Sequence, residues 1–436
     1  MPANSDYRFV VSRRILRKTA RASAGVTALL VFLCFTAMSE PIVIVGKMVP
    51  SLLGAPIKNL RVVNRSGECI PFQIDEIDST GDYVCPSGRE PNRGTGILDT
   101  ADEIVFLWED ADSAPVPQTS AAVVSVAVRH DAAVRYVGIV SDTLVKPSNV
   151  SYINYDEKKE KLTTPYYYAC FGHNRFHFTS AGIMDFVRNS YVDVTNELRI
   201  RIFCKGLWGL LPVTLTENNI VCLVKRYKAG PVRLIRRGDF HLSLGFFFKG
   251  SHAAVNQICY PQMVRVPVYV HLPVRFKTWF SQAYIEMTPV LRKEASDFAF
   301  TVPSQGISLG FNALHGTDTL IKVNPNHSCM AVHNGSIGYG WLLDAAMDER
   351  YLSGSGYLFK SQAGPEAIGH CGFRLTVRDL PKGYYLIGNW VFFSKTGVQS
   401  LAEACNHVSK NALLSISGSQ IVYYNQLNKV QQFRKR

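Results

Sequence analysis

The stretch VRVPVYVH, residues 264–271, decides the fold class. Its valines occupy every second position, and the residues between them are arginine, proline, tyrosine and histidine. A period of two sends alternate side chains to opposite faces of a β-strand, so one face is apolar and the other is mostly polar. ELRIRI, residues 197–202, repeats this pattern with leucine and isoleucine. Both stretches predict strands of antiparallel sheets with one buried face.

The composition of the whole chain agrees with a large β protein. Of its 436 residues, 47% are hydrophobic and only 19% are charged, which excludes a disordered chain and predicts a large core. Aromatic residues reach 11%, and 32 glycines and 21 prolines interrupt short apolar runs. We therefore predict an all-β fold: an antiparallel β-sandwich or supersandwich with one or two peripheral helices. The helix signals are a capping box at 400–403 and a short segment at 344–352.

The first 39 residues have the features of a cleaved export signal. Basic residues precede an apolar run over 24–38, which is shorter than the roughly 20 residues that span a bilayer as a helix. Small residues at Ala37 and Ser39 predict cleavage before Glu40, and a retained membrane anchor is the alternative. Segment 12–18 also resembles a twin-arginine signal, but the match is partial and we favour the general secretory route. We expect the mature protein in the periplasm or outside the cell, with no stable transmembrane span.

Turn residues divide the mature sequence into two β regions. Residues 40–145 predict a first β-sandwich region, because its strands are short and regularly interrupted. Residues 146–165 are polar and charged and predict a linker or long surface loop, and 166–436 predict a larger supersandwich-like region. The net charge of +13 becomes about +8 when the six basic residues and one acid of 1–39 are removed. No dense basic stretch indicates a nucleic-acid partner.

Nine of the ten cysteines belong to the mature chain, and none forms a C-x-x-C pair. This argues against zinc ribbons and thioredoxin-like redox motifs. Cys69 and Cys85 flank a turn-rich segment and are the candidate disulfide of an exported protein. For most of the nine, the alternative is a small buried hydrophobic residue.

Three segments together carry a resemblance: PFQIDE at 71–76, ILDTADEIVF at 97–106 and GPVRLIR at 230–236. Their order resembles a poorly characterised group of exported bacterial β-proteins. That group is similar to the sugar-binding supersandwich of galactose-mutarotase-like domains, which also occurs in polysaccharide lyases. The resemblance implies the architecture, and it assigns no catalytic residue.

The segment HNRFH, residues 173–177, follows three tyrosines at 166–168 and is the candidate catalytic segment. On a strand, His173, Arg175 and His177 would share one face. Arg175 would then neutralise the carboxylate of an acidic sugar, and a histidine would remove the neighbouring proton, with Tyr167 as a further catalytic candidate. The alternative is that these side chains are ordinary hydrogen-bonded surface or core residues.

An acidic cluster is the candidate metal site. Asp75, Asp78 and Asp82 have the spacing of an irregular calcium loop, and calcium is the one cofactor that the sequence suggests. The EF-hand spacing is absent, and turn-forming acids explain the cluster as well.

A basic strand pair is the candidate substrate-binding surface. Arg233, Arg236 and His241 would line a cleft for polyanionic glycans, and a solvated sheet face is the alternative.

These observations predict an exported carbohydrate-recognition protein of the cell envelope that is not catalytic. The alternatives are a polysaccharide lyase or related glycan-processing enzyme, and a structural envelope protein that binds other proteins. The expected partner is carbohydrate, including acidic polysaccharide, and not nucleic acid. The sequence contains no G-x-S-x-G elbow, HExxH motif, P-loop or dinucleotide fingerprint, which counts against the common hydrolases, zincins, NTPases and dehydrogenases.

Overall fold

The computed structural model describes most of the chain from Glu40 onward. The described ranges are 40–117, 123–130, 133–173, 175–206, 210–216, 221–242, 251–272, 274–278, 280–311, 318–324, 328–345, 348–361, 367–394, 412–416 and 421–424. The chain divides into two compact units, Met1–Met38 and Ser39–Arg436, and the fold below belongs to the second. The predicted export signal and the capping box at 400–403 lie outside the described residues. Within the described ranges, no helix has the length and apolar character needed to cross a membrane.

The fold is all-β, which confirms the prediction from the alternating stretches. Strands make up 59% of the structure and helical residues 8%, and no described helix reaches seven residues. Of the segment predicted as a helix at 344–352, the first two residues end a strand, and the described residues from 348 onward form one short 3-10 turn, at whose start Asp348 accepts a hydrogen bond from the backbone N–H of Arg350 at 3.0 Å. The 3-10 turns are η1 (Gly46–Met48), η2 (Pro50–Leu52), η3 (Ile57–Asn59), η4 (Trp108–Asp110), η7 (Phe276–Thr278), η8 (Lys293–Ala295), η9 (Pro303–Gln305) and η12 (Glu349–Leu352).

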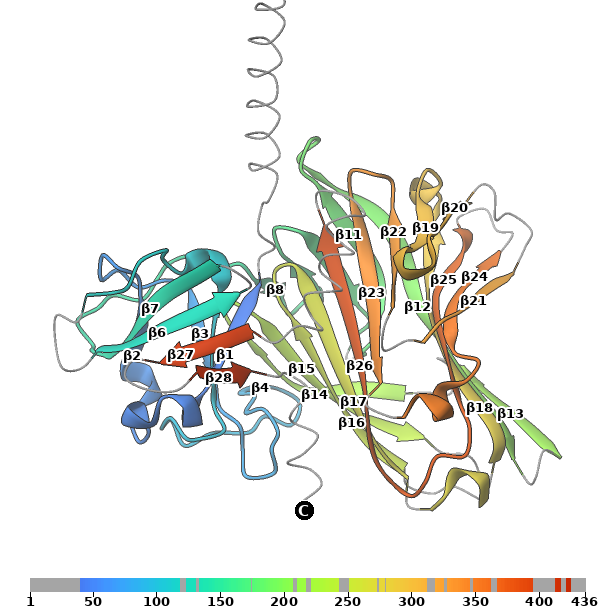
Figure 1. Ribbon diagram of the computed structural model, residues 1–436, viewed down its shortest axis with the longest axis horizontal. Coiled ribbons are helices and arrows are strands. Elements are labelled where there is room, and N and C mark those ends of the chain that lie inside the picture. The colour runs from blue at the N-terminus through green and yellow to red at the C-terminus, as the bar shows by residue number, and fades with distance from the viewer. Residues whose placement is uncertain are drawn as a thin grey trace, which may run out of the picture. The chain divides into compact units, whose positions relative to one another are not determined.

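Two ten-stranded antiparallel sheets, sheet I and sheet II, make up the larger part of the structure (Figure 1). Sheet I runs in the order β21 (Thr319–Lys322), β24 (Gly356–Ser361), β25 (Ala367–Val377), β18 (Phe280–Arg292), β12 (Ser190–Gly206), β11 (Phe178–Asp185), β10 (Tyr167–Phe171), β9 (Lys161–Thr163) and β8 (Asn154–Asp156), and β13 (Leu211–Thr216) also pairs with β12. Sheet II runs in the order β20 (Ile307–Gly310), β19 (Ala299–Val302), β22 (Cys329–His333), β23 (Gly338–Ala345), β26 (Gly383–Ser394), β17 (Met263–Leu272), β16 (Ser251–Cys259), β15 (Leu234–Leu242), β14 (Val221–Ala229) and β4 (Ser87–Gly88).

The main hydrophobic core lies between these two sheets. Its buried side chains come from both, for example Leu198 of β12 and Leu234 of β15. On β17, the valines of the alternating stretch face this interior, and Val264 and Val266 lie opposite Val391 and Asn389 of β26. The predicted buried face of the alternating stretch is therefore the inner face of sheet II.

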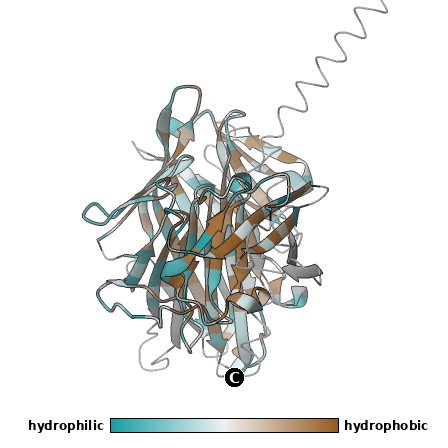
Figure 2. Cartoon of the chain, turned by 90° about the vertical axis from the view of Figure 1, so that its left-hand side faces the viewer, coloured by the Kyte–Doolittle hydropathy of each residue, from teal (hydrophilic) through white to brown (hydrophobic). Residues whose placement is uncertain are grey.

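Two smaller sheets form a separate sandwich with its own core. The first contains β1 (Pro41–Val45), β5 (Glu103–Leu107) and β3 (Phe72–Asp75), and the second contains β2 (Leu60–Val63), β7 (Ala133–Ser141), β6 (Val123–His130), β27 (Ala412–Ile416) and β28 (Ile421–Tyr424). Their apolar side chains pack together, and Figure 2 shows hydrophobic residues along these strands and hydrophilic ones in the surrounding loops. The strands β27 and β28 show that the C-terminal part of the chain returns to complete this sandwich.

The segment predicted as a linker, 146–165, is partly built into sheet I. It contains β8 and β9, which form the edge of that sheet beside β10. The N-terminal region likewise contributes a strand to the larger sheets: β4 pairs with β14 and forms an edge of sheet II. A polar segment can take this place because an edge strand leaves one row of backbone groups and many side chains in contact with water.

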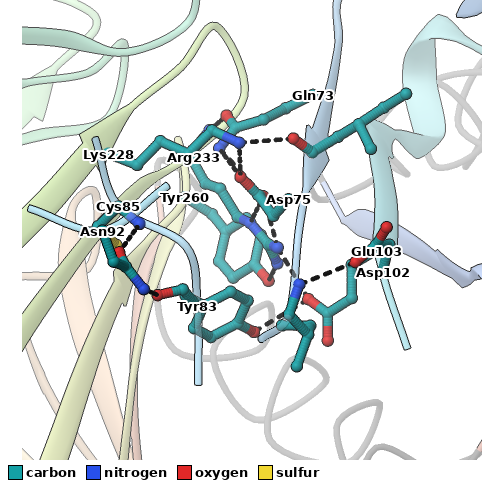
Figure 3. Close-up of polar contacts among 12 residues, drawn as sticks. Gln73, Asp75, Tyr83, Cys85, Asn92, Asp102, Glu103, Lys228, Arg233 and Tyr260 are labelled. Atoms are coloured by element: carbon teal, nitrogen blue, oxygen red, sulfur yellow. Dashed lines mark hydrogen bonds and ion pairs between the residues drawn. The ribbon is translucent and has the colours of Figure 1, made fainter. Parts of the chain in front are cut away.

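A buried ion-pair network joins the small sandwich to sheet II (Figure 3). Arg233, just before β15, has a wholly buried side chain, although the sequence predicted it on a basic surface. Its Nη2 lies 2.6 Å from Oδ2 of Asp75 on β3 and 2.8 Å from Oε2 of Glu103 on β5. The Arg233 guanidinium also donates to the Tyr260 hydroxyl at 2.9 Å. Since a buried guanidinium is costly unless it is paired, these contacts determine where β3 and β5 meet β15.

The carboxylate of Asp75 is held by cations on two sides. Lys228 Nζ lies 2.9 Å from Asp75 Oδ1, and Gln73 donates to the same oxygen at 2.8 Å. Burial alone would raise the pKa of Asp75, but Arg233 and Lys228 keep it below its ordinary value. The three sequence segments that carried the resemblance thus supply the members of one network: Asp75, Glu103 and Arg233.

We predict that replacing Arg233 by methionine removes about 3–5 kcal/mol of unfolding free energy, because Asp75 and Glu103 remain buried without their shared cation. Urea denaturation followed by circular dichroism measures this. Adding Asp75→Asn and Glu103→Gln to Arg233→Met should recover part of the loss, since no buried carboxylate is then left unpaired.

The control for this prediction is Arg275→Ala. Arg275 forms an ion pair with Asp379 at 2.7 Å, but that pair is exposed, so its loss should barely move the urea midpoint. Equal effects of Arg233→Met and Arg275→Ala would contradict the structural role of the buried network.

Candidate functional site

The candidate catalytic segment does not form a strand face. Residues Gly172 to Arg175 make a turn, closed by a hydrogen bond of 2.8 Å from the Arg175 N–H to the Gly172 carbonyl. His173 and Arg175 are exposed, whereas His177 is half-buried and lines an interior cavity between the two large sheets. The predicted common face therefore does not exist, because the period of two that it required is interrupted by the turn.

Tyr167 lies inside the protein. It is wholly buried on β10, its ring stacks on Phe393 with centroids 4.0 Å apart, and its hydroxyl donates to the Tyr260 carbonyl at 3.0 Å. Burial raises the pKa of Tyr167 well above its ordinary value, so the phenol stays neutral. In this structure Tyr167 is a core residue and not part of a surface catalytic group.

Arg236, the second predicted substrate-binding arginine, also points inward. Its guanidinium donates to Gln257 at 2.8 Å and lies 3.1 Å from the carboxylate of Glu160. It also lies over the Phe171 ring, 3.6 Å from the centroid. The basic strand pair predicted as a glycan surface thus directs Arg233 and Arg236 into the interior. His241 pairs with His252 along β15 and β16, and its side chain lies outside the described ones.

The three predicted calcium ligands have separate partners. Asp75 belongs to the buried network, and Asp78 accepts hydrogen bonds from the backbone N–H groups of Thr80 and Asp82 at 2.9 and 3.1 Å. Asp82 is paired with Arg237 at 2.6 Å. In the described part of the chain, no three His, Cys, Asp or Glu side chains are grouped as metal ligands would be. This donor set does not fit calcium, which needs six to eight oxygen ligands around one point.

The candidate disulfide is not formed in the structure. Cys69 and Cys85 are both free, and Cys85 is wholly buried. Burial, with a smaller contribution from nearby Asp75, raises the pKa of Cys85 to about 12. The thiol therefore stays protonated and unreactive, as the buried-hydrophobe alternative predicted.

A surface pocket on the outer face of sheet II is the candidate functional site. Alternation on β17 places Arg265, Pro267 and Tyr269 on the face opposite the valines. The neighbouring strands bring Asn256 and Arg237 to the same face, and their Cα positions are paired in the sheet. The pocket has a volume of about 210 Å³ and is lined by Thr80, Gly81, Asp82, Tyr83, Arg237, Asn256, Ile258, Arg265, Pro267 and Tyr269.

The turn that carries Asp82 and Tyr83 closes one side of the pocket. Asp82 Oδ2 lies 2.6 Å from Arg237 and 3.8 Å from Arg226, and burial raises the pKa of Asp82 in spite of these cations. The Tyr83 hydroxyl donates to Glu103 at 2.9 Å, which anchors the pocket wall to the buried network. Burial and the Glu103 charge raise the pKa of Tyr83 well above its ordinary value, so Tyr83 is a neutral phenol.

The side-chain oxygen of Asn256, a residue that lines the pocket, indicates that the pocket binds a ligand. The residue is 6% exposed, and its Oδ1 has no hydrogen-bond partner in the protein. A buried acceptor without a donor costs free energy, so this atom is suited to a ligand hydroxyl or amide. Arg265, whose guanidinium lies over the Trp390 ring at 4.8 Å from the centroid, adds a second cation to the pocket.

The sequence contained a signal for this pocket that was not recognised. Arg265 and Tyr269 were identified as the polar side of an alternating strand, and Asp82 as a candidate ligand of calcium. The contact between the polar side of this strand and the turn at 80–83 could not be predicted from the sequence. It joins residues almost 200 positions apart, and local patterns do not report such contacts.

A second charged group lies on the outer face of sheet I. Glu286 is buried beside Lys360 and Arg374, at 2.6 and 2.8 Å, and these cations keep its pKa low in spite of its burial. His370 lies next to this group, with Nε2 3.2 Å from Arg199. Burial, Arg199 and Lys360 lower the pKa of His370 to about 4, so its imidazole is neutral at physiological pH.

Comparisons with known proteins show likeness in architecture only. No protein-family model and no curated protein matches the chain. Among solved structures, an α-mannosidase from Enterococcus faecalis V583 aligns over 88% of this chain with a TM-score of 0.48 and 6% identity. The chain spans only 45% of the length of that mannosidase. A mutant of the heparan sulfate lyase HepC from Pedobacter heparinus aligns over 47% of this chain and 28% of its own, with a TM-score of 0.25 and 9% identity. These neighbours are carbohydrate-active enzymes, and all are β-rich.

We predict that His370 makes the protein sensitive to acid. The pKa of His370 is lower in the folded chain than the ordinary value of 6.5, so the unfolded chain binds more protons and stability falls as the pH drops from 6.5 towards 4. His370→Gln should reduce the stability lost between pH 7 and pH 4.5 by about 2 kcal/mol, measured by urea denaturation at both pH values.

The matched control for this prediction is His173→Gln, because the exposed His173 keeps its contact with water in both states. If His370→Gln and His173→Gln lost the same stability on acidification, the acid sensitivity would not come from His370.

Proposed function

We propose that the protein binds carbohydrate through the pocket of Asp82, Arg237, Asn256, Arg265 and Tyr269, without catalysing a reaction. The observation that carries this proposal is the unpartnered Oδ1 of Asn256, placed among arginine donors and a tyrosine ring in a concave site. The proposed place of action is outside the cytoplasm, in the cell envelope or beyond it.

The chemistry of the pocket suits a sugar ring. A pyranose presents hydroxyl groups that both donate and accept hydrogen bonds, and it also presents C–H faces that pack on aromatic rings. Asn256 Oδ1 accepts from a hydroxyl, the Arg237 guanidinium donates to one, and Tyr269 offers a ring. Small-molecule sites typically combine such an apolar surface with a few fixed polar groups.

The charge of the pocket favours an acidic sugar. Two guanidinium groups, those of Arg237 and Arg265, line it together with the single carboxylate of Asp82, and Arg226 lies 3.8 Å from that carboxylate. The excess of positive charge suits the carboxylate of a uronate, which a planar guanidinium can bind through two parallel hydrogen bonds.

The same residues argue for binding and not for catalysis. Glycoside hydrolysis uses two carboxyl groups on opposite sides of the scissile bond, and among the described residues that line this pocket only Asp82 has one. Tyr83, one of the two tyrosines that line the pocket, donates a hydrogen bond to Glu103 and has a raised pKa, which makes it a poor base. The lyase alternative would need His173, His177 and Tyr167 in one cleft. His177 and Tyr167 both line the interior cavity between the two large sheets, but His173 lies in an exposed turn and does not reach it.

Buried thiols are compatible with the proposed place of action. Burial raises the pKa of Cys222 and of Cys259 to about 12, so neither forms the thiolate that oxidation requires. Such cysteines persist in an oxidising compartment without pairing.

We predict that the protein binds oligogalacturonate at least about tenfold more tightly than a neutral galacto-oligosaccharide of equal length, because only the first presents carboxylates to the arginines. Isothermal titration calorimetry measures both affinities, and added salt should weaken only the acidic ligand. Tyr269→Ala should reduce the affinity for oligogalacturonate about tenfold through the lost ring contact.

Tyr284→Ala is the matched control. Tyr284 lies on β18 of sheet I, with the Arg374 guanidinium 4.9 Å from its ring centroid, so it has similar surroundings away from the pocket. If neither oligosaccharide bound at millimolar concentration, or if both tyrosine variants weakened binding equally, the proposal would fail.

A further inference from the structure

A cavity lies between sheet I and sheet II, on the opposite side of β17 from the carbohydrate pocket. It has a volume of about 240 Å³. Its walls are mainly aliphatic and come from the inner faces of both sheets: Leu198, Ile200 and Ile202 of β12, Ile285 and Met287 of β18, and Val264, Val266, Val268 and Val270 of β17. Protein interiors are normally packed without voids larger than a water molecule, so a space of this size needs an explanation.

Four polar atoms in the cavity wall have no hydrogen-bond partner in the protein. They are Thr195 Oγ1, Tyr339 OH, Trp341 Nε1 and Asn389 Oδ1. Each of the four residues is at most 5% exposed, so bulk water does not satisfy these atoms. Burying such a group without a partner costs about 1–3 kcal/mol. Four such atoms around one cavity therefore indicate a bound molecule that supplies partners to some of them.

The four atoms come from both sides of the cavity. Thr195 lies on β12 of sheet I, and the other three lie on β23 and β26 of sheet II. Trp341 pairs with Val391, so its indole lies one inward-facing position from Asn389 along β26. Burial raises the pKa of Tyr339 well above its ordinary value, so it is a neutral phenol able to donate. A ligand hydroxyl can donate to the Asn389 oxygen and accept from two of the donors, whereas a ligand carbonyl can accept from two donors but leaves the Asn389 oxygen without a partner.

The wall excludes a charged ligand. Among the described residues that line the cavity there is no Asp, Glu, Lys or Arg, and His177 is the one histidine. The guanidinium of Arg236 contacts Gln257 and Phe171 of the cavity wall, but it does not line the cavity and is paired with Glu160 at 3.1 Å. A carboxylate or ammonium group placed here would be desolvated without a counter-charge.

Several aliphatic residues of the cavity wall are more accessible than the residues that carry the unpartnered polar atoms. Ile202 and Ile285, which pair across β12 and β18, are only half-buried, and so are Val268 and Val270 across the cavity on β17. The residues that carry the polar atoms are at most 5% exposed. This arrangement suits a molecule that enters with its polar group first and leaves its aliphatic part along the valines and isoleucines.

We propose that this cavity is a second binding site, for an uncharged, mainly aliphatic molecule that carries one hydroxyl or carbonyl group. An engineered apolar cavity of about 150 Å³ in another protein holds benzene, so by proportion this one holds about ten heavy atoms. A medium-chain alcohol such as 1-octanol fits that size and chemistry. This site is independent of the carbohydrate pocket.

The test compares 1-octanol with octanoate at pH 8, where the two probes have the same chain length and differ in charge. Isothermal titration calorimetry with the full chain should show 1-octanol binding with one site, and at least tenfold weaker binding of octanoate. The melting temperature should rise with 1-octanol concentration, because the ligand binds the folded state. The absence of 1-octanol binding, or equal affinities for the two probes, would overturn the proposal.

Tyr339→Phe tests the role of the polar atoms. The variant removes a hydroxyl that has no partner in the protein, so it should fold with unchanged or higher stability and still lose about fivefold in 1-octanol affinity. Tyr357→Phe is the matched control, because the Tyr357 hydroxyl donates to the Ser328 carbonyl at 2.6 Å in the buried core. It should lose stability and keep its 1-octanol affinity. The opposite pattern would show that the polar atoms do not contact the probe.

Val266→Phe tests the location by filling the space. It should abolish 1-octanol binding while the chain remains folded, since the cavity has room for the larger side chain. Val187→Phe, at a position 91% exposed, is the control and should bind 1-octanol as the unchanged protein does. If Val266→Phe also bound 1-octanol with unchanged affinity, the probe would occupy another place and the proposal would fail.

Discussion

The buried guanidinium of Arg233 is the constraint on which the arrangement of this protein depends (Figure 3). Its charge is removed from water and balanced by Asp75 and Glu103, which belong to two strands of a different sheet. Such a group is stable only when all its partners are in place, so the small sandwich has few alternative positions against sheet II. The same network also anchors Tyr83 through Glu103, and Tyr83 forms a wall of the proposed carbohydrate pocket. The geometry of the outer site is therefore tied to a buried charge.

Strand β17 has an apolar face and a polar face because apolar and polar side chains alternate along it. Its valines line the interior cavity, and Arg265 and Tyr269 face the pocket on the other side. A shift of one residue in its register with β26 would exchange the two faces and place the Arg265 charge in the apolar interior. The apolar face thus specifies the register, and the register in turn places the polar groups of the outer pocket. The two proposed sites share a single strand and the constraint that determines it.

Much of the fold could be predicted from the sequence, because alternation and turn residues are local signals. The all-β class and the inward-facing valines follow from a period of two. That period assigns side chains to faces but does not say what covers each face, so Arg233 and Arg236 were expected on a surface and lie in the interior. The strand predicted around His173 is absent for a different reason: β10 ends at Phe171, and the Arg175 N–H donates to the Gly172 carbonyl, so a glycine, which is a turn signal, marks the end of the strand. The proposed carbohydrate pocket depends on a contact between distant segments, which no local pattern reveals.

The empty space of the interior cavity and its unpartnered polar atoms both lower the stability of the folded protein. A protein selected for stability alone would fill the space between sheet I and sheet II with larger side chains and would replace Tyr339 by phenylalanine, since its hydroxyl has no partner. Trp341 likewise retains an N–H with no acceptor, at a position where another aromatic ring would pack as well. The interior therefore gives up packing and hydrogen bonding at the same place, and a ligand would restore both. Binding sites are where such departures from the most stable arrangement are expected, because the groups that recognise a ligand are necessarily left unsatisfied without it.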